Sequence, residues 1–121
     1  MKLKTKANTI ILTNEDEIFK NTDYSNESFS IHLKELSPLE TLELNKKHTK
    51  IIEGKEETDF ISMSTEQLFR SIVSWEGIKD EEDNDIDITE ENIKQIMLFD
   101  NSFAKLVLQK LYTLYSKKKK K

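Results

Sequence analysis

The stretch Met63–Phe99 constrains the fold most, because its residues mark two helices and the connection between them. Ser64 and Gln67 have the spacing of a capping box, which predicts that a helix begins at Ser64. Gly77 follows the apolar run of this helix, and a glycine in the left-handed conformation is a common helix stop. The sequence therefore predicts a helix over 64–76.

A second helix start lies beyond an acidic loop in the same stretch. Thr89 is followed by Glu90 and Glu91, and a threonine cap with acidic residues in the first turn is typical of a helix N-terminus. We therefore expect a helix over 89–99.

The segment before these helices has the alternating pattern of strands. Residues 2–12 alternate, which predicts a half-buried strand with Ile11 on its inner side, and residues 18–19 predict a short return strand. A clearer strand has apolar residues at every second position, namely Phe29, Ile31 and Leu33. We expect an antiparallel sheet of two or three strands within 1–36.

A further helix is expected between the sheet and the central stretch. Ser37 and Glu40 form a second capping box, and Pro38 occupies the first helical position, where its missing N–H is not needed. These residues predict a helix over 37–53. Two sets of residues are candidates for its inner side: Leu39, Leu42, Thr49 and Ile52, or Leu44 and Ile51.

The last predicted helix, over 101–116 with Asp100 as its cap, is apolar on two sides. One face carries Phe103, Leu106, Val107, Leu111 and Leu114, and the other carries Leu108, Tyr112 and Tyr115. Burying a large apolar side chain fully is worth about 1.5–3 kcal/mol. The second face therefore predicts that another polypeptide covers it, and self-association would serve the same need.

Together these elements predict an α+β fold, with a small N-terminal antiparallel sheet followed by a mainly helical bundle of about four helices. At 121 residues the chain has the length of one domain, which we place at 1–116. The lysines at 117–121 are too uniform to pack, and we expect a disordered tail there.

Composition excludes several classes of function. The chain has no cysteine, so disulfides and thiolate chemistry are excluded, and its net charge of −4 argues against nucleic-acid binding. No apolar run approaches the length that spans a membrane, and the N-terminus lacks the pattern of an export signal. We therefore expect a soluble cytoplasmic protein.

The acidic loop over 80–87 invites comparison with calcium-binding loops. However, Asp85 stands where such loops need glycine, and Asp87 stands where they carry an apolar residue. His32 and His48 have no second ligand at metal spacing, and the chain holds no nucleophile motif or phosphate-binding glycine loop. We expect no metal site, no cofactor and no enzymatic activity.

Trp75 is the only tryptophan of the chain, and two roles remain open for it. A tryptophan at the end of an amphipathic helix commonly anchors the core. Tryptophan is also enriched among the residues that dominate binding at protein interfaces.

Residues 72–94, IVSWEGIKDEEDNDIDITEENIK, resemble the tail assembly chaperones of long-tailed phages and prophages. In that family a helix ends in a Trp-x-Gly-apolar unit, an acidic turn follows, and an apolar-Thr-x-Glu-Asn element opens the next helix. The matching positions here are Trp75, Gly77 and Ile78, then 80–85, then Ile88, Thr89, Glu91 and Asn92. The chain departs from the family in lacking a glycine near 83–84 and in having Asp87 where a proline is common.

The resemblance implies a non-catalytic chaperone in the cytoplasm of a bacterial host. Such a protein binds the long helical tape-measure protein, keeps it soluble and brings tail-tube subunits to it. The residues we expect to bind this partner are Leu108, Tyr112 and Tyr115, with Trp75 and Ile78 near the base of the same face. The alternatives are a structural tail component of the connector or terminator type that stays in the virion, and an unrelated small protein-interaction module.

Overall fold

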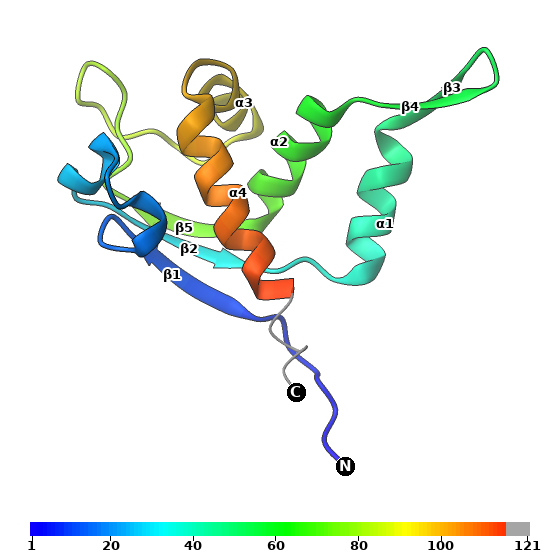
Figure 1. The fold of residues 1–121 in the computed structure, drawn as a ribbon, viewed down its shortest axis with the longest axis horizontal. Coiled ribbons are helices and arrows are strands. Elements are labelled where there is room, and N and C mark those ends of the chain that lie inside the picture. Colours follow the sequence, from blue (N-terminus) through cyan, green and yellow to red (C-terminus); the bar gives the residue numbers. More distant parts are fainter. Residues whose placement is uncertain (116–121) are drawn as a thin grey trace.

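A three-stranded antiparallel sheet forms the base of the molecule in the computed structural model, which describes residues 1–115. Its strands are β1 (Thr9–Thr13), β2 (Ser30–Lys34) and β5 (Ile72–Glu76), in the order β1-β2-β5 (Figure 1). The α+β class expected from the sequence is confirmed, with three strands in the main sheet. The tail expected at 117–121 lies outside the described residues.

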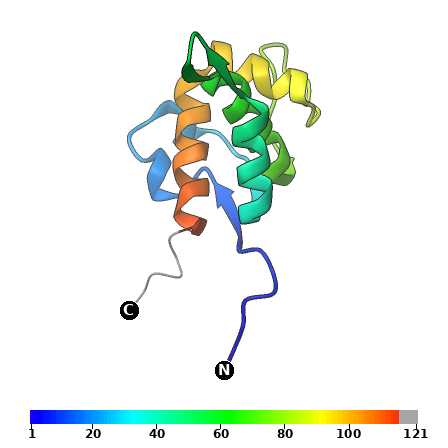
Figure 2. The ribbon, with the colours of Figure 1, turned by 90° about the vertical axis from the view of Figure 1, so that its right-hand side faces the viewer.

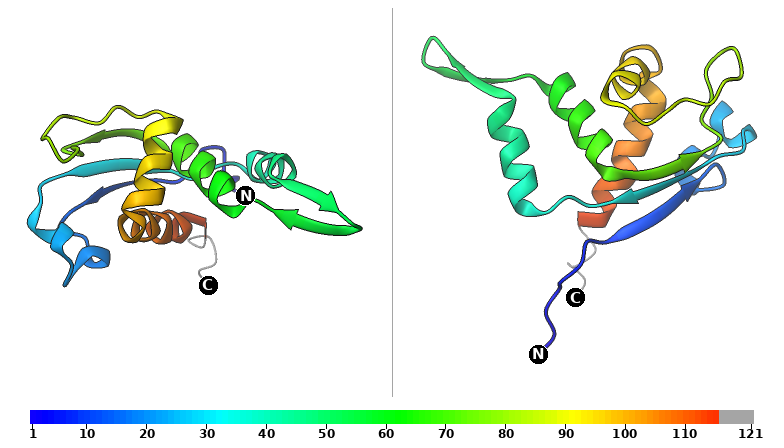
Figure 3. Two further views of the ribbon diagram at one scale, coloured as in Figure 1. Left: turned by 90° about the horizontal axis from the view of Figure 1, so that it is seen from above. Right: turned by 180° about the vertical axis from the view of Figure 1, so that it is seen from behind.

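Four α-helices and a separate β-hairpin complete the described chain. The helices are α1 (Pro38–Lys47), α2 (Phe60–Ser71), α3 (Glu90–Phe99) and α4 (Asn101–Tyr115). The hairpin consists of β3 (Thr49–Ile52) and β4 (Lys55–Thr58), and two 3-10 turns, η1 (Glu17–Phe19) and η2 (Asp23–Asn26), connect β1 to β2. Helices α2, α3 and α4 gather on one side of the sheet, whereas α1 and the hairpin extend away from it (Figures 1 and 3).

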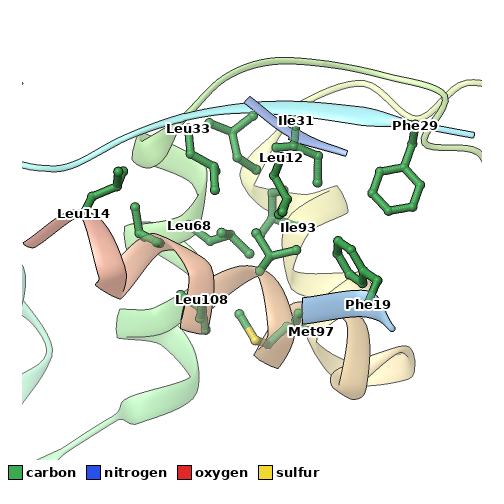
Figure 4. Packing of buried hydrophobic residues seen from close by; sticks show 14 residues of the cluster. Leu12, Phe19, Phe29, Ile31, Leu33, Leu68, Ile93, Met97, Leu108 and Leu114 are labelled. Carbon is green, nitrogen blue, oxygen red and sulfur yellow. The ribbon is translucent and has the colours of Figure 1, made fainter. Parts of the chain in front are cut away.

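The hydrophobic core lies between the sheet and the three helices that cover it (Figure 4). Leu12 of β1 and Ile31 and Leu33 of β2 point from the sheet toward the helices, and all three are almost completely buried. The helices and η1 meet them with a second set of buried side chains: Phe19, Leu68, Ile93, Met97, Val107, Leu108, Leu111 and Leu114. The central strand β2 therefore contributes most directly to this core.

Two of the predicted helix starts are confirmed in detail. The Ser37 side chain accepts a hydrogen bond from Glu40 N at 3.1 Å, and the Glu40 side chain accepts one from Ser37 N at 3.0 Å. Thr89 Oγ1 accepts a hydrogen bond from Asn92 N at 3.0 Å. Each cap satisfies backbone N–H groups that have no partner inside the helix, so the local sequence alone was sufficient to place it.

The N-terminal strand is shorter than expected and faces the other way. It forms only over Thr9–Thr13, where Leu12 is buried and Ile11 is exposed. Apolar residues stand at three consecutive positions here, so alternation could not decide which side faces the core. Residues 18–19 belong to η1 instead of a return strand, because the Asp16 side chain accepts a hydrogen bond from Ile18 N and starts a tight turn.

The helix expected over 37–53 ends at Lys47 and is followed by the hairpin. Glu53 and Gly54 connect the two strands with φ values of 52° and 78°. Positive φ at both central residues is typical of the tight turns that match the twist of a hairpin. Of the residues expected on the inner side of this helix, only Leu44 is buried.

The helix expected over 64–76 begins earlier and ends earlier. Asp59 caps it by accepting a hydrogen bond from Ser62 N at 3.1 Å, so Ser64 lies inside α2. The chain leaves the helix after Ser71, and Ile72–Glu76 becomes β5, in which Trp75 pairs with Ile31 of β2. Long-range pairing with β2 therefore overrides a helical pattern that the local sequence also allows.

Gly77 has the left-handed conformation that we expected, with φ of 81°, although it ends a strand and not a helix. A Cβ atom at this position would lie 2.3 Å from the Ser28 carbonyl oxygen and 3.0 Å from Phe29 Cα. Gly54 also has a positive φ, but a Cβ atom there would meet nothing within 4 Å.

These two glycines allow a matched test of the close approach at Gly77. We expect Gly54→Ala to lower the free energy of unfolding by about 1 kcal/mol, because its strain comes from φ alone. Gly77→Ala should lower it by about 1–3 kcal/mol more, because its methyl group also meets backbone atoms that cannot move aside easily. Urea unfolding of both variants measures the difference, and equal losses would contradict it.

Candidate partner-binding groove

A groove of about 1150 Å³ is lined by residues of α1 and of the C-terminal end of α4. Figure 2 shows the course of these two helices. The α1 wall carries Leu42 and Asn45, the α4 wall carries Tyr112 and Tyr115, and Gln67 of α2 lies between them. Glu40 and Thr41 of α1 also line it. The remaining lining comes from residues 4–7 near the N-terminus and from residues 34–38, which run from the last residue of β2 to the first residue of α1. Two helices thus form the long walls of an open, largely apolar hollow.

The two tyrosines of α4 differ in what they contribute to the groove. The Tyr115 hydroxyl accepts a hydrogen bond from Leu36 N at 2.8 Å, so this half-buried side chain holds the segment before α1 against α4. Tyr112 is 49% exposed, and its hydroxyl donates to Gln67 Oε1 at 3.3 Å. Partial burial and the neighbouring Tyr115 raise the pKa of Tyr112 above its ordinary value, so it remains a neutral ring on the wall.

The wall formed by α1 exposes two large apolar side chains. Leu42 is 56% exposed and lines the groove opposite the tyrosines. Leu39 is also exposed on the same helix, but it does not line the groove. Leu44 is the buried leucine of α1. The helix therefore presents two comparable leucines, of which one faces the hollow.

The N-terminal segment is attached at the rim of the groove by polar contacts. Lys4 Nζ forms an ion pair with the Glu35 carboxylate, and Asn8 Nδ2 donates to the Leu114 carbonyl at 2.9 Å. These contacts join the segment to the residues before α1 and to the last turn of α4. They complete the side of the groove that neither helix forms.

A buried carboxylate attaches α1 to α2 at the other end of the helix. Glu66 Oε1 lies 2.9 Å from both Lys47 Nζ and His48 Nε2, and Glu66 Oε2 lies 2.7 Å from Arg70 Nη2. The Glu66 side chain is 6% exposed. Burial alone would raise the pKa of this carboxyl, but the hydrogen bonds from His48, Lys47 and Arg70 prevail and lower it to about 2.

This lowered pKa predicts acid sensitivity. A carboxylate with a pKa of 4.5 unfolded and about 2 folded stabilises the fold fully above pH 4.5, and the contribution is lost as the pH falls toward 2. We expect Glu66→Gln to lower the free energy of unfolding by about 3 kcal/mol near neutral pH and to flatten its dependence between these pH values. Denaturant unfolding across the acid range measures both effects.

Glu43→Gln is the control for this prediction, because Glu43 lies on the exposed side of α1 and outside the cluster. The variant removes one carboxylate without touching Glu66. If the free energy of unfolding depended on acid pH in the same way in both variants, the Glu66 contacts would not be the cause of the acid sensitivity.

The structure separates the five residues that the sequence predicted for partner binding. Tyr112 and Tyr115 lie together in the groove, with ring centroids 6.5 Å apart. Leu108 is 9% exposed and belongs to the core, so the expectation that it offers surface to a partner is wrong for this fold. Trp75 and Ile78 line a separate hollow of about 340 Å³ beside the acidic loop, and not the base of the tyrosine face.

Trp75 connects the main sheet to this acidic loop. Its Nε1 donates to the Ile86 carbonyl at 2.8 Å, while Ile86 N donates to the Ile78 carbonyl at 3.0 Å. Within the loop, Asp80 Oδ1 accepts hydrogen bonds from the backbone N–H groups of Glu82 and Asn84. The carboxylate of Asp80 thus organises the turn itself, and the part of the chain that is described shows no group of three potential metal ligands.

The Trp75 hydrogen bond predicts a local effect on the loop. Trp75→Phe keeps an aromatic ring but leaves the Ile86 carbonyl without this donor, so the loop should open more often. We expect faster hydrogen exchange at the Ile86 amide, with unchanged exchange at the Ile93 amide in α3. Exchange measured by NMR distinguishes this from general destabilisation, which would accelerate both amides.

Sequence reasoning missed Leu42 and Gln67 as groove residues and misplaced the exposed apolar surface. The available signal was the spacing of Leu39, Leu42 and Leu44, which cannot all face one side of a helix of ten residues.

Of the described helices, none has the length and apolar character needed to cross a membrane. Comparisons of the chain with protein-family models, with curated proteins and with solved structures found no match.

Proposed function

We propose that the protein is a non-catalytic tail assembly chaperone of a phage or prophage, acting in the cytoplasm of the bacterial host. In this proposal an amphipathic helix of the tape-measure protein lies in the groove between α1 and α4. The bound chaperone keeps that helix soluble and brings tail-tube subunits to it. The observation that carries the proposal is the groove itself, together with the likeness of residues 72–94 to this family.

The groove has the form that helix binding requires. A helix docks through apolar side chains at i, i+3, i+4 and i+7, which need a long apolar hollow with polar edges. Leu42 and Tyr112 supply apolar surface on opposite walls, and Lys4, Lys34 and Glu40 supply polar groups around them. Its volume of about 1150 Å³ is also larger than most pockets for small molecules, which span about 300–1,000 Å³.

Both carboxylates that line the groove, those of Glu35 and Glu40, have structural partners, which favours binding over catalysis. The Glu40 side chain accepts a hydrogen bond from Ser37 N in the capping box of α1. The Glu35 carboxylate forms its ion pair with Lys4 and also accepts a hydrogen bond from Asn8 N at 3.2 Å. These carboxylates stabilise the walls of the groove, and the exposed apolar side chains are left to contact a partner.

The test is co-expression with the tape-measure protein encoded by the same phage or prophage, measuring how much of that protein stays soluble. Leu42→Asp should abolish both solubilisation and co-purification, because it places a charge inside the apolar groove. Tyr112→Asp should act in the same way from the opposite wall. Leu39→Asp is the matched control, because it changes an equally exposed leucine of α1 outside the groove.

Tyr115 is left unchanged in this experiment, because its hydroxyl bonds to Leu36 N and its replacement would also disturb the fold. Circular dichroism and thermal unfolding should show that the three variants remain folded. Full activity of both Leu42→Asp and Tyr112→Asp would move the binding site away from the groove. Mass spectrometry of purified virions separates a chaperone, which should be absent from them, from a structural tail component, which should be present.

A further inference from the structure

The β3–β4 hairpin stands away from the rest of the molecule as a two-stranded sheet (Figures 1 and 3). Among the described residues, no other strand pairs with either of its edges. Ile51 of β3 is 73% exposed and its neighbour Ile52 is 47% exposed. A two-stranded hairpin is only marginally stable in water, and three or more strands are usually needed. The hairpin therefore has both open edges and uncovered apolar side chains.

The hydrogen-bond pattern shows which groups of β3 face outward. Asp59 N donates to the His48 carbonyl at 2.8 Å, next to the register pair Thr49↔Thr58. Bonded and non-bonded pairs alternate along an antiparallel ladder. The bonded pairs are therefore Lys50↔Glu57 and Ile52↔Lys55, and the backbone N–H and C=O groups of Thr49 and Ile51 point to the open edge.

Charge distinguishes the two open edges of the hairpin. The outward-pointing backbone groups of β4 belong to Glu56 and Thr58. Pairing two β4 edges places Glu56 opposite Glu56, or Glu57 opposite Glu57 when the register shifts. Like charges directly opposite each other destabilise a sheet. The β3 edge carries Lys50 as its one charged residue, so it can pair with a copy of itself.

We propose that two copies of this chain join through their β3 edges into a four-stranded antiparallel sheet with Ile51 at the two-fold axis. In this register Ile51 lies opposite Ile51 of the second copy, and Lys50 lies opposite Ile52. The next allowed register would place Lys50 opposite Lys50, so charge selects the one centred on Ile51. A two-fold contact of this kind closes after two copies.

This dimer is independent of the groove and of the function proposed for it. The hairpin continues from the C-terminal end of α1, whereas the groove is lined by Glu40, Thr41, Leu42 and Asn45 of the same helix. Loss of the dimer therefore need not remove partner binding, and loss of partner binding need not remove the dimer. Variants at Leu42 and at Ile51 test the two proposals separately.

The absence of cysteine from the chain makes disulfide cross-linking a direct test. Residues in a bonded antiparallel pair have Cα atoms about 5.5 Å apart, within the range that a disulfide can bridge. Ile51→Cys should therefore form a covalent dimer rapidly on mild oxidation at low protein concentration. Glu56→Cys is the matched control, because Glu56 is the direct partner of Ile51 in the hairpin but lies on the other edge. Equal rates for the two variants, or no dimer from Ile51→Cys, would overturn the proposal.

Light scattering after size exclusion gives a second readout without a cross-link. The unaltered protein should have the mass of two copies. Ile51→Pro should be a monomer, because proline removes an outward N–H that the dimer needs and leaves the bonded pairs of the hairpin in place. Glu56→Pro makes the same change on the β4 edge and should remain a dimer. A monomeric unaltered protein would overturn the proposal. A mass that keeps growing with protein concentration would also overturn it, because it would indicate that β3 of one copy pairs with β4 of the next.

Discussion

The buried Glu66 carboxylate is the interaction on which the outer half of the molecule depends. Glu66 lies on α2 and binds Lys47 and His48 at the C-terminal end of α1, as well as Arg70 of its own helix. These three partners compensate the free-energy cost of burying the carboxylate. Helix α1 is one wall of the groove, and the β3–β4 hairpin continues directly from it. The position of both surfaces thus depends on this ionic cluster, together with the hydrogen bond from Leu36 N to the Tyr115 hydroxyl and the packing of Leu44, the one buried residue of α1.

The molecule therefore has two parts with different physical character. The three-stranded sheet with α2, α3 and α4 encloses the core, and α4 contributes five buried residues to it. The part formed by α1 and the hairpin instead exposes Leu39, Leu42, Ile51 and Ile52. The sequence indicated more apolar surface than a single copy can cover, and it placed that excess on α4. The structure buries most of α4 and leaves exposed apolar side chains on α1 and β3, and also on α2 and α3, where Phe60 and Phe99 are exposed.

The features that the sequence predicted correctly are those decided within a few residues. Capping by Ser37 and Thr89 and the positive φ of Gly77 depend on local backbone geometry, and they were identified from neighbouring residues. The strand β5 and the hairpin were missed, because Ile72–Glu76 and Thr49–Ile52 follow helical segments and also fit a helical pattern. Their strand conformation is selected by pairing, in β5 with a partner far away in the sequence. Likewise, Tyr112 and Tyr115 were identified by exposure on a helix, but their neighbour Leu42 could be found only from the fold.

The position of β5 has a consequence for how the protein reaches its structure during synthesis. Strands β1 and β2 are neighbours in the chain and can pair as soon as both have emerged, whereas the other edge of β2 waits for β5. Until α4 is also made, the helical layer above Ile31 and Leu33 is incomplete, because only α2 and α3 are present to cover them. Contacts between distant segments slow folding, because the intervening chain must be closed into a loop first. The nascent protein thus carries an open strand edge until β5 has been made and a partly covered apolar sheet until α4 follows, and α4 completes the helical layer over this sheet.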